Sequence, residues 1–155
     1  CIKISNLTID MNMPRLNLVC VIDDDELIRR VFEMLIANYN IADKTLCFEN
    51  GLTALNYLHK YKDEPELLPE LILLDIRMPI VDGWGFMQGY AALAHKLSKK
   101  VVVYMVSSSI DYTDHQKAKS LELLSGFVVK PVTKSVLQDM ANNVIKQMMP
   151  DYVTA

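Results

Sequence analysis

The sequence predicts an α/β fold, a doubly wound five-stranded parallel sheet with helices on both faces. Short apolar runs alternate five times with longer amphipathic segments, which is the pattern of strand–helix crossover units. The apolar runs are continuous rather than alternating, as expected of parallel strands that are buried on both faces. A length of 155 residues fits one domain of this kind.

Five apolar runs predict the strands, at residues 18–22, 45–48, 71–74, 101–106 and 126–129. Helices are expected at about 26–39, from 51 on, from 83 to about 98, at 111–124 and at 133–148. In the first helix, one stripe carries the apolar residues Leu27, Val31, Met34 and Leu35, which indicates an amphipathic helix. Residues 63–70 contain two prolines and predict a loop.

Composition and charge argue against several classes of protein. A net charge of −3 does not favour binding to the phosphate backbone of nucleic acids. No apolar run approaches the roughly 20 residues of a membrane-spanning helix, and the N-terminus lacks a secretory signal pattern. The three cysteines are odd in number and show no CxxC spacing, so we expect reduced thiols and a cytoplasmic location.

Polar side chains follow every predicted strand, and the carboxyl ends of parallel strands meet at one edge of a sheet. Glu49 and Asn50 after the second strand have no clear role, but the residues after the other four do. They are Asp23 and Asp24 after the first strand, Asp75 after the third, Ser107 and Ser108 after the fourth, and Lys130, before Pro131, after the fifth. Singly, each has an ordinary structural explanation as a helix cap, a turn former or a solvated loop residue. Their convergence on one edge is what indicates chemistry.

Such a cluster has the parts of a phosphoryl-acceptor site. Neighbouring carboxylates repel one another, and a hard divalent cation such as Mg²⁺ relieves the repulsion. A carboxylate is also a competent nucleophile towards phosphorus. A metal, a lysine ammonium and a hydroxyl together match the negative charge that spreads over the oxygens of a transferring phosphoryl group.

Four segments of the sequence resemble response-regulator receiver domains of the chemotaxis type, the CheY-like family. They are VIDDDELIRR (21–30), LLDIRMP (73–79) with Asp82-Gly83 shortly after it, VSS (106–108) and GFVVKP (126–131). The resemblance implies a flavodoxin-like sheet with the strand order 2-1-3-4-5. It also implies a receiver domain at 16–149, between an N-terminal lead-in or cloning remnant (1–15) and a C-terminal tail (150–155).

The resemblance implies a role for each residue of the cluster. Asp75 is the expected phosphorylation site. The expected ligands of Mg²⁺ or Mn²⁺ are Asp24, Asp75, the main-chain carbonyl of Arg77 and, through water, Asp23. The expected phosphoryl-contact and switch residues are Ser107, Ser108, Lys130 and Phe127, and Lys130 is expected to pair with Asp75 before phosphorylation. The peptide bond between Lys130 and Pro131 is expected to be cis, which is energetically accessible before proline.

Three features depart from the commonest pattern of the family. Phe127 stands where many members have tyrosine, so it lacks a hydroxyl. Arg77 places a cation beside the acceptor, and we hypothesise that it changes the phosphoryl lifetime by contacting the group or by blocking water. Residues 62–70 are longer than in compact members and are expected to be a surface insertion.

The implied function is signalling rather than enzymatic turnover. A sensor histidine kinase or a histidine phosphotransfer protein would supply the phosphoryl group. The helix at 111–124, the strand at 126–129 and the helix at 133–148 would then present an altered surface to a downstream protein or a second copy of the chain. The apolar residues Met140, Val144, Ile145, Met148 and Met149 can belong to that surface or to the core. The chain either acts alone or is part of a longer regulator.

Other functions remain as alternatives at this stage. The runner-up is a receiver-like interaction module that works without phosphorylation, although the complete acceptor set argues against it. A phosphatase of the haloacid-dehalogenase type would have a second aspartate two residues after the nucleophile, where this sequence has Arg77. A dinucleotide-binding enzyme would have a GxGxxG motif after the first strand, and none is present.

Overall fold

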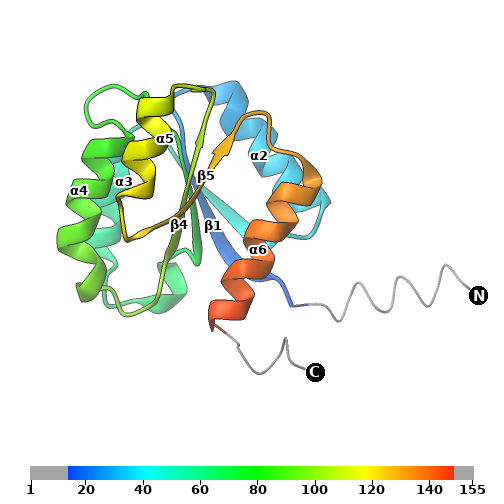
Figure 1. Ribbon diagram of the computed structural model, residues 1–155. Helices are drawn as coiled ribbons and strands as arrows, with labels where there is room; N and C mark the ends of the chain where they lie inside the picture. Colours follow the sequence, from blue (N-terminus) through cyan, green and yellow to red (C-terminus); the bar gives the residue numbers. More distant parts are fainter. Residues whose placement is uncertain (1–13, 149–155) are drawn as a thin grey trace, which may run out of the picture.

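A computed structural model describes residues 14–148 and confirms the predicted parallel sheet with helices on both faces (Figure 1). The strands are β1 (Leu16–Ile22), β2 (Ala42–Phe48), β3 (Leu71–Leu74), β4 (Val102–Ser107) and β5 (Leu124–Val129). They lie in the order β2-β1-β3-β4-β5, as predicted, and every neighbouring pair is parallel. Apart from Pro14 and Arg15, the predicted lead-in lies outside the described residues, as do Met149 and the predicted tail.

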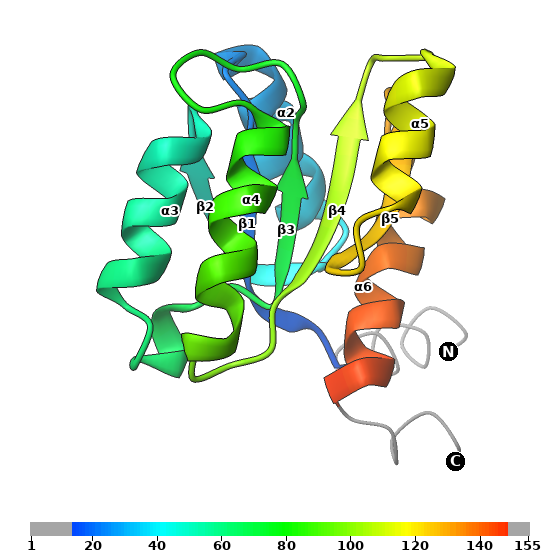
Figure 2. The same ribbon diagram turned by 60° about the vertical axis from the view of Figure 1, so that its left-hand side comes forward.

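Helices cover both faces of the sheet, and each face has its own apolar core (Figure 2). The α-helices are α2 (Glu26–Asn38), α3 (Gly51–Lys60), α4 (Gly83–Leu93), α5 (Tyr112–Lys119) and α6 (Lys134–Met148), and short 3-10 helices span Pro65–Leu67 and Ala94–Lys96. Side chains of α3, α4 and α5 pack on one face, and those of α2 and α6 on the other. In the described range 14–148, no helix combines the length and apolarity needed to cross a lipid bilayer.

The central strand β3 shows why continuous apolar runs become the middle of the sheet. Its four residues, Leu71–Leu74, are all buried, alternately in one core and in the other. Burying a leucine or isoleucine side chain contributes roughly 1.5–3 kcal/mol each, so a run without polar residues is most stable between two helical layers. The charged residue that ends this run, Asp75, therefore emerges at the carboxyl edge.

Side-chain caps fix where the helices begin at that edge. Asp25 accepts a hydrogen bond from Leu27 N at the start of α2, and Asp82 accepts one from Gly85 N at the start of α4. Asn50 and Asp111 cap α3 and α5 in the same way. The helix-cap explanation offered for the acids after β1 thus applies to Asp25, which leaves Asp23 and Asp24 free for other contacts.

The sequence-based assignment of the apolar stripe in α2 is wrong in part. Leu27, Val31 and Met34 are exposed to 68%, 43% and 62%, whereas the helix buries Phe32 and Ile36. Two stripes of apolar residues run along this helix, and amphipathic periodicity does not say which one faces the sheet. The exposed stripe begins at the carboxyl edge with Leu27 and runs along the outer side of α2.

Some element ends also differ from those predicted. β2 begins at Ala42 rather than 45, because an edge strand tolerates the polar residues Asp43 and Lys44. α5 ends at Lys119 rather than 124, where the Ser120 hydroxyl donates to the Lys117 carbonyl and competes with helix continuation. α4 ends at Leu93 and continues only as the 3-10 helix.

The segment expected to be a surface insertion is tied to the domain at the amino edge of the sheet. The Lys99 ammonium donates to the carbonyls of Pro65 and Leu68 and pairs with the buried carboxylate of Glu70 at 2.9 Å. Leu68 itself is fully buried. In α6, Met140, Val144 and Ile145 are buried in the core on their face of the sheet, so they are not part of a methionine-rich contact surface.

The two stripes of α2 predict opposite responses to truncation. Ile36→Ala is expected to lower the free energy of unfolding by about 3 kcal/mol, because it leaves a cavity in the core. Met34→Ala, on the exposed stripe, is expected to change it by less than about 0.5 kcal/mol. Urea unfolding of the two variants measures this contrast, and equal losses would contradict the orientation of α2.

Candidate functional site

Main-chain hydrogen bonds that extend the strand ladders position the cluster at the carboxyl edge. Asp23 N donates to Phe48 O at 3.1 Å, and Asp75 N donates to Ile22 O at 2.9 Å. Lys130 N likewise donates to Ser107 O at 2.8 Å. Each residue is thus held by the end of a neighbouring strand, and the register of four strands brings the predicted side chains together.

Three carboxylates form the centre of the site. Asp23, Asp24 and Asp75 each place a carboxylate oxygen within 4.8 Å of the others. Asp23 is 3% exposed, the Asp75 side chain is 11% exposed, and Asp24 is exposed to solvent. The cluster is therefore a half-open acidic pocket, with one wall in the sheet and one side facing solvent.

Lys130 is the cation closest to these acids. Its ammonium lies 2.6 Å from Asp23 Oδ2 and 3.6 Å from Asp75 Oδ1. The resemblance implied a pair with Asp75, but the closer partner in the structure is Asp23. The peptide bond between Lys130 and Pro131 is cis.

The environment of Asp75 disfavours its charged form. The pKa of this carboxyl is raised from an ordinary value of 3.8 to about 6. Burial is the largest cause and the negative charge of Asp23 adds to it, while Lys130 and the Ile76 N–H oppose the rise. One lysine therefore does not neutralise the three acids. Oxygen donors with surplus negative charge and an open side suit a hard divalent cation, so the residues fit Mg²⁺.

The expected hydroxyl and aromatic residues surround the acids in different ways. Ser107 is buried, and its Oγ accepts a hydrogen bond from Ser109 N at 3.2 Å, while Ser108 is exposed. Phe127 is half-buried and packs against the ring of His115, with the ring centroids 4.1 Å apart. β4, β5 and α5 are therefore linked at this edge by one hydroxyl and one aromatic contact.

Two residues that shape the site, Arg29 and Gly83, were given no site role from the sequence. The Arg29 guanidinium donates to the main-chain carbonyl of Asp23 at 2.8 Å, whereas its neighbour Arg30 pairs with Glu26 on the outer face of α2. Nothing in the sequence separates these two arginines. At Gly83, a Cβ atom would lie 2.5 Å from the carbonyl oxygen of Asp75, so only glycine allows this close approach to the acceptor loop.

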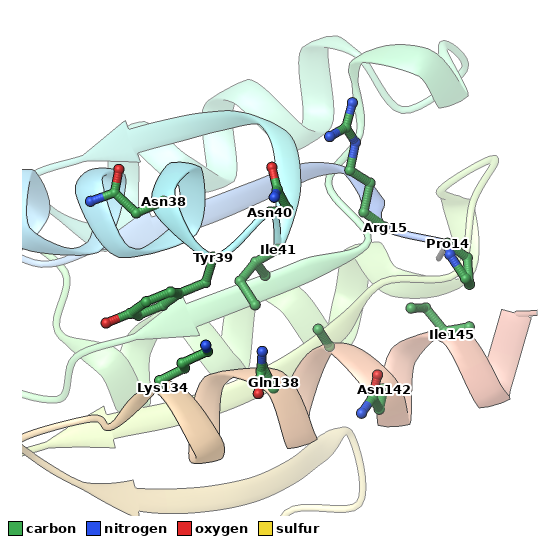
Figure 3. A pocket seen from close by; sticks show the side chains of 11 residues that line it. Pro14, Arg15, Asn38, Tyr39, Asn40, Ile41, Lys134, Gln138, Asn142 and Ile145 are labelled. Carbon is green, nitrogen blue, oxygen red and sulfur yellow. The ribbon is translucent and has the colours of Figure 1, made fainter. Parts of the chain in front are cut away.

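The cavity shown in Figure 3 lies away from this chemistry. It has a volume of about 560 Å³ and lies between the end of α2 and α6. The Lys134 ammonium lies 4.9 Å from the centroid of the Tyr39 ring in this cavity, and Gln138 and Asn142 also line it. Asp23, Asp24 and Asp75 do not border this cavity. The acidic site is therefore identified by its charge and geometry rather than by a deep pocket.

A parallel sheet in this order, with acids, a hydroxyl and a lysine gathered at its carboxyl edge, defines the class of signal-receiver domains. The sequence agrees, because residues 19–142 match the response regulator receiver domain family. The chain belongs to this family. Receiver domains are signalling domains of two-component systems. They bind Mg²⁺ at an acidic pocket and interact with histidine kinases and downstream targets.

Individual relatives support the same assignment. The chemotaxis protein CheY of Halobacterium salinarum is 28% identical over 82% of this chain and 95% of its own length. A two-component response regulator from Cytophaga hutchinsonii superposes with a TM-score of 0.77 at 26% identity, over 86% of this chain and 99% of that one.

Other relatives are longer. A probable transcriptional regulator, ycf27, of Guillardia theta is 26% identical over 93% of this chain but only 51% of its own length. Its namesake in Galdieria sulphuraria is 28% identical over 48% of its length. The chain thus spans about half the length of these two relatives.

The raised pKa of Asp75 predicts how stability depends on pH in the absence of divalent metal. The folded state holds this proton more tightly than the unfolded chain, so the free energy of unfolding should fall as the pH rises from about 4 to about 6. Asp75→Asn removes the buried charge and should raise the free energy of unfolding at pH 7 by on the order of 2 kcal/mol. Chemical unfolding in a chelator across this pH range measures both effects, and an unchanged pH slope in Asp75→Asn would contradict them.

Proposed function

We propose that this receiver domain accepts a phosphoryl group on Asp75 from a phosphohistidine donor, in a reaction that depends on a divalent cation. The observation that carries the proposal is the gathering of three carboxylates within 4.8 Å beside the Lys130 ammonium. This arrangement offers a nucleophile, a cation site and a fixed positive charge within one half-open pocket.

In the proposed step, a carboxylate oxygen of Asp75 attacks phosphorus, a new O–P bond forms, and the N–P bond to the donor histidine breaks. With a pKa near 6, Asp75 is mostly ionised at neutral pH and is therefore a competent nucleophile. Lys130 faces the oxygens of the incoming group and offsets their charge. The Ser107 hydroxyl, on the last residue of β4, can rotate to donate to the same group.

Asp23, Asp24 and Asp75, with the main-chain carbonyl of Arg77, are the residues that would hold Mg²⁺ or Mn²⁺. The bound cation would supply positive charge that neutralises phosphoryl oxygens. Asp23 keeps its orientation through Lys130 and through Asp25 N, which donates to its Oδ1 at 2.9 Å. Asp24 is exposed to solvent, so its carboxylate can give up bound water and bind the cation without local unfolding.

We further propose that the acylphosphate changes the surface formed by α5, β5 and α6, which a downstream protein or a second copy of the chain reads. Ser107 contacts the β4–α5 loop through Ser109, and Phe127 packs on α5 through His115. A phosphoryl group that recruits Ser107 would bias both contacts. Exposed apolar side chains already lie on this surface, among them Ile110, Tyr112 and Leu123.

The exposed stripe of α2 is the surface that we propose for the phosphohistidine donor. Because Asp75 is nearly enclosed, a donor imidazole must approach across the carboxyl edge, where α2 begins and the β3–α4 loop lies (Figure 1). Leu27, Val31 and Met34 on α2 and Ile80 in that loop are all exposed apolar side chains. A helix of a histidine phosphotransfer protein or kinase could bury its apolar face against them. Transfer in a reducing, cytoplasmic compartment is consistent with the free thiols of Cys20 and Cys47.

Treatment with acetyl phosphate and Mg²⁺ tests the acceptor directly. Intact-mass analysis should show one added phosphoryl group in the wild type and none in Asp75→Asn, and chelation of the metal should abolish the addition. Asp24→Asn should raise the Mg²⁺ concentration needed for half-maximal labelling at least tenfold, because it removes a direct ligand. Labelling of Asp75→Asn to the wild-type level would place the acceptor elsewhere, and no labelling of the wild type would favour a phosphorylation-independent module.

Donor docking is tested by comparing two phosphodonors on the same variants. The first phosphodonor is a histidine phosphotransfer protein that labels the wild type. Leu27→Asp and Val31→Asp should slow this labelling about tenfold or more, because each substitution places a charge in an apolar contact where it loses its water. Labelling of the same variants by acetyl phosphate should stay at the wild-type rate, since α2 side chains on this stripe do not touch the acids. Equal loss with both donors would instead indicate damage to the site.

A further inference from the structure

Arg77, the residue two positions after the acceptor, faces an acid that belongs to no part of the acceptor site. Its Nη2 atom lies 3.9 Å from Asp114 Oδ2 in the first turn of α5, and the Arg77 side chain is 78% exposed. The separation is longer than a hydrogen bond, so this ion pair is weak and easily released. Asp114 is nevertheless well placed, since its side chain is only 16% exposed.

Asp114 is held in place by the loop that carries the expected switch hydroxyl. The Ser109 hydroxyl donates to Asp114 Oδ2 at 2.6 Å, and the Ser109 N–H donates to Ser107 Oγ at 3.2 Å. A continuous polar chain therefore runs from Ser107 through Ser109 and Asp114 to Arg77. One end of this chain, Ser107, is the last residue of β4, and the other, Arg77, follows Asp75 in the loop after β3.

α5 has little else to hold it against the sheet. Ala118 is its only buried residue within the described chain. The Lys117 ammonium lies 4.6 Å from the centroid of the Trp84 ring in α4, and the His115 ring packs on Phe127 of β5, with the ring centroids 4.1 Å apart. The position of this helix thus depends on a few electrostatic and aromatic contacts rather than on a packed apolar face.

We propose that Asp114 is a positioning residue that competes with the phosphoryl group for Arg77. Without a phosphoryl group, Arg77 faces Asp114 and the first turn of α5 is anchored to the β3–α4 loop. A phosphoryl group on Asp75 presents more negative charge two residues from Arg77 and draws its guanidinium away. Recruitment of Ser107 then loosens the other end of the chain, and α5 loses its anchor. The inference rests on the proposed phosphorylation of Asp75 and adds a second route, besides Ser107 and Phe127, from that group to α5.

A double-mutant cycle with beryllofluoride, an analogue of the phosphoryl group, tests this competition. Binding in the presence of Mg²⁺ is followed by the fluorescence of Trp84, the single tryptophan, which lies beneath Lys117 of α5. Asp114→Asn keeps an acceptor for the Ser109 hydroxyl but removes the charge, and should raise the affinity for beryllofluoride about twofold to fivefold, the worth of a weak ion pair. Asp114→Glu should restore the wild-type affinity.

The control variants separate competition from a general charge effect. In an Arg77→Gln background, Asp114→Asn should leave the affinity unchanged, because the contested cation is absent. Asp43→Asn removes a carboxylate from an arginine pair near the opposite edge of the sheet and should also have no effect. An equal rise with and without Arg77, or no rise at all, would overturn the proposal. Failure of the wild type to bind beryllofluoride or to be labelled by acetyl phosphate would overturn the proposed function instead.

Discussion

Electrostatic repulsion among three carboxylates at the ends of two parallel strands is the constraint on which this domain depends. β1 and β3 are paired in a register that places Asp23 and Asp75 side by side, and both strands are fixed by burial on both faces. The fold therefore cannot relax to separate the acids. It contains the repulsion instead, with Lys130 against Asp23 and a raised pKa for Asp75, and it leaves surplus negative charge that a divalent cation would offset.

The pairing of Lys130 with Asp23 neutralises the acids unequally. A lysine 2.6 Å from Asp23 and 3.6 Å from Asp75 leaves Asp75 the less neutralised of the two acids. In the proposed reaction, an incoming phosphoryl group would meet an Asp75 carboxylate with one oxygen held by Ile76 N. Lys130 would then be close enough to shift towards the new charge while the end of β5 stays fixed by the bond from Lys130 N to Ser107 O.

The extent to which the sequence predicts the structure follows from the range of the interactions involved. The buried β3 and the gathering of Asp23, Asp24, Asp75, Ser107 and Lys130 were predictable from the apolar runs and from what ends each run, whereas the strand order came from the family resemblance. The burial of α2 was not, since it carries two apolar stripes and only the sheet selects Phe32 and Ile36. Arg29 and Asp114 were missed because charged residues on helices look alike in a sequence, and only the fold shows that Arg29 reaches the Asp23 carbonyl and that Asp114 faces Arg77.

The placement of weak contacts explains how a small chemical change could alter a distant surface. α2 and α6 are anchored by large side chains in one core, and α3 and α4 by those in the other. α5 contributes a single buried alanine and is held by charged and aromatic groups that reach towards the acceptor loop. Because phosphorylation changes charge, the proposed phosphorylation of Asp75 would act most strongly on the helix that depends most on charge, while the packed helices would keep the site intact.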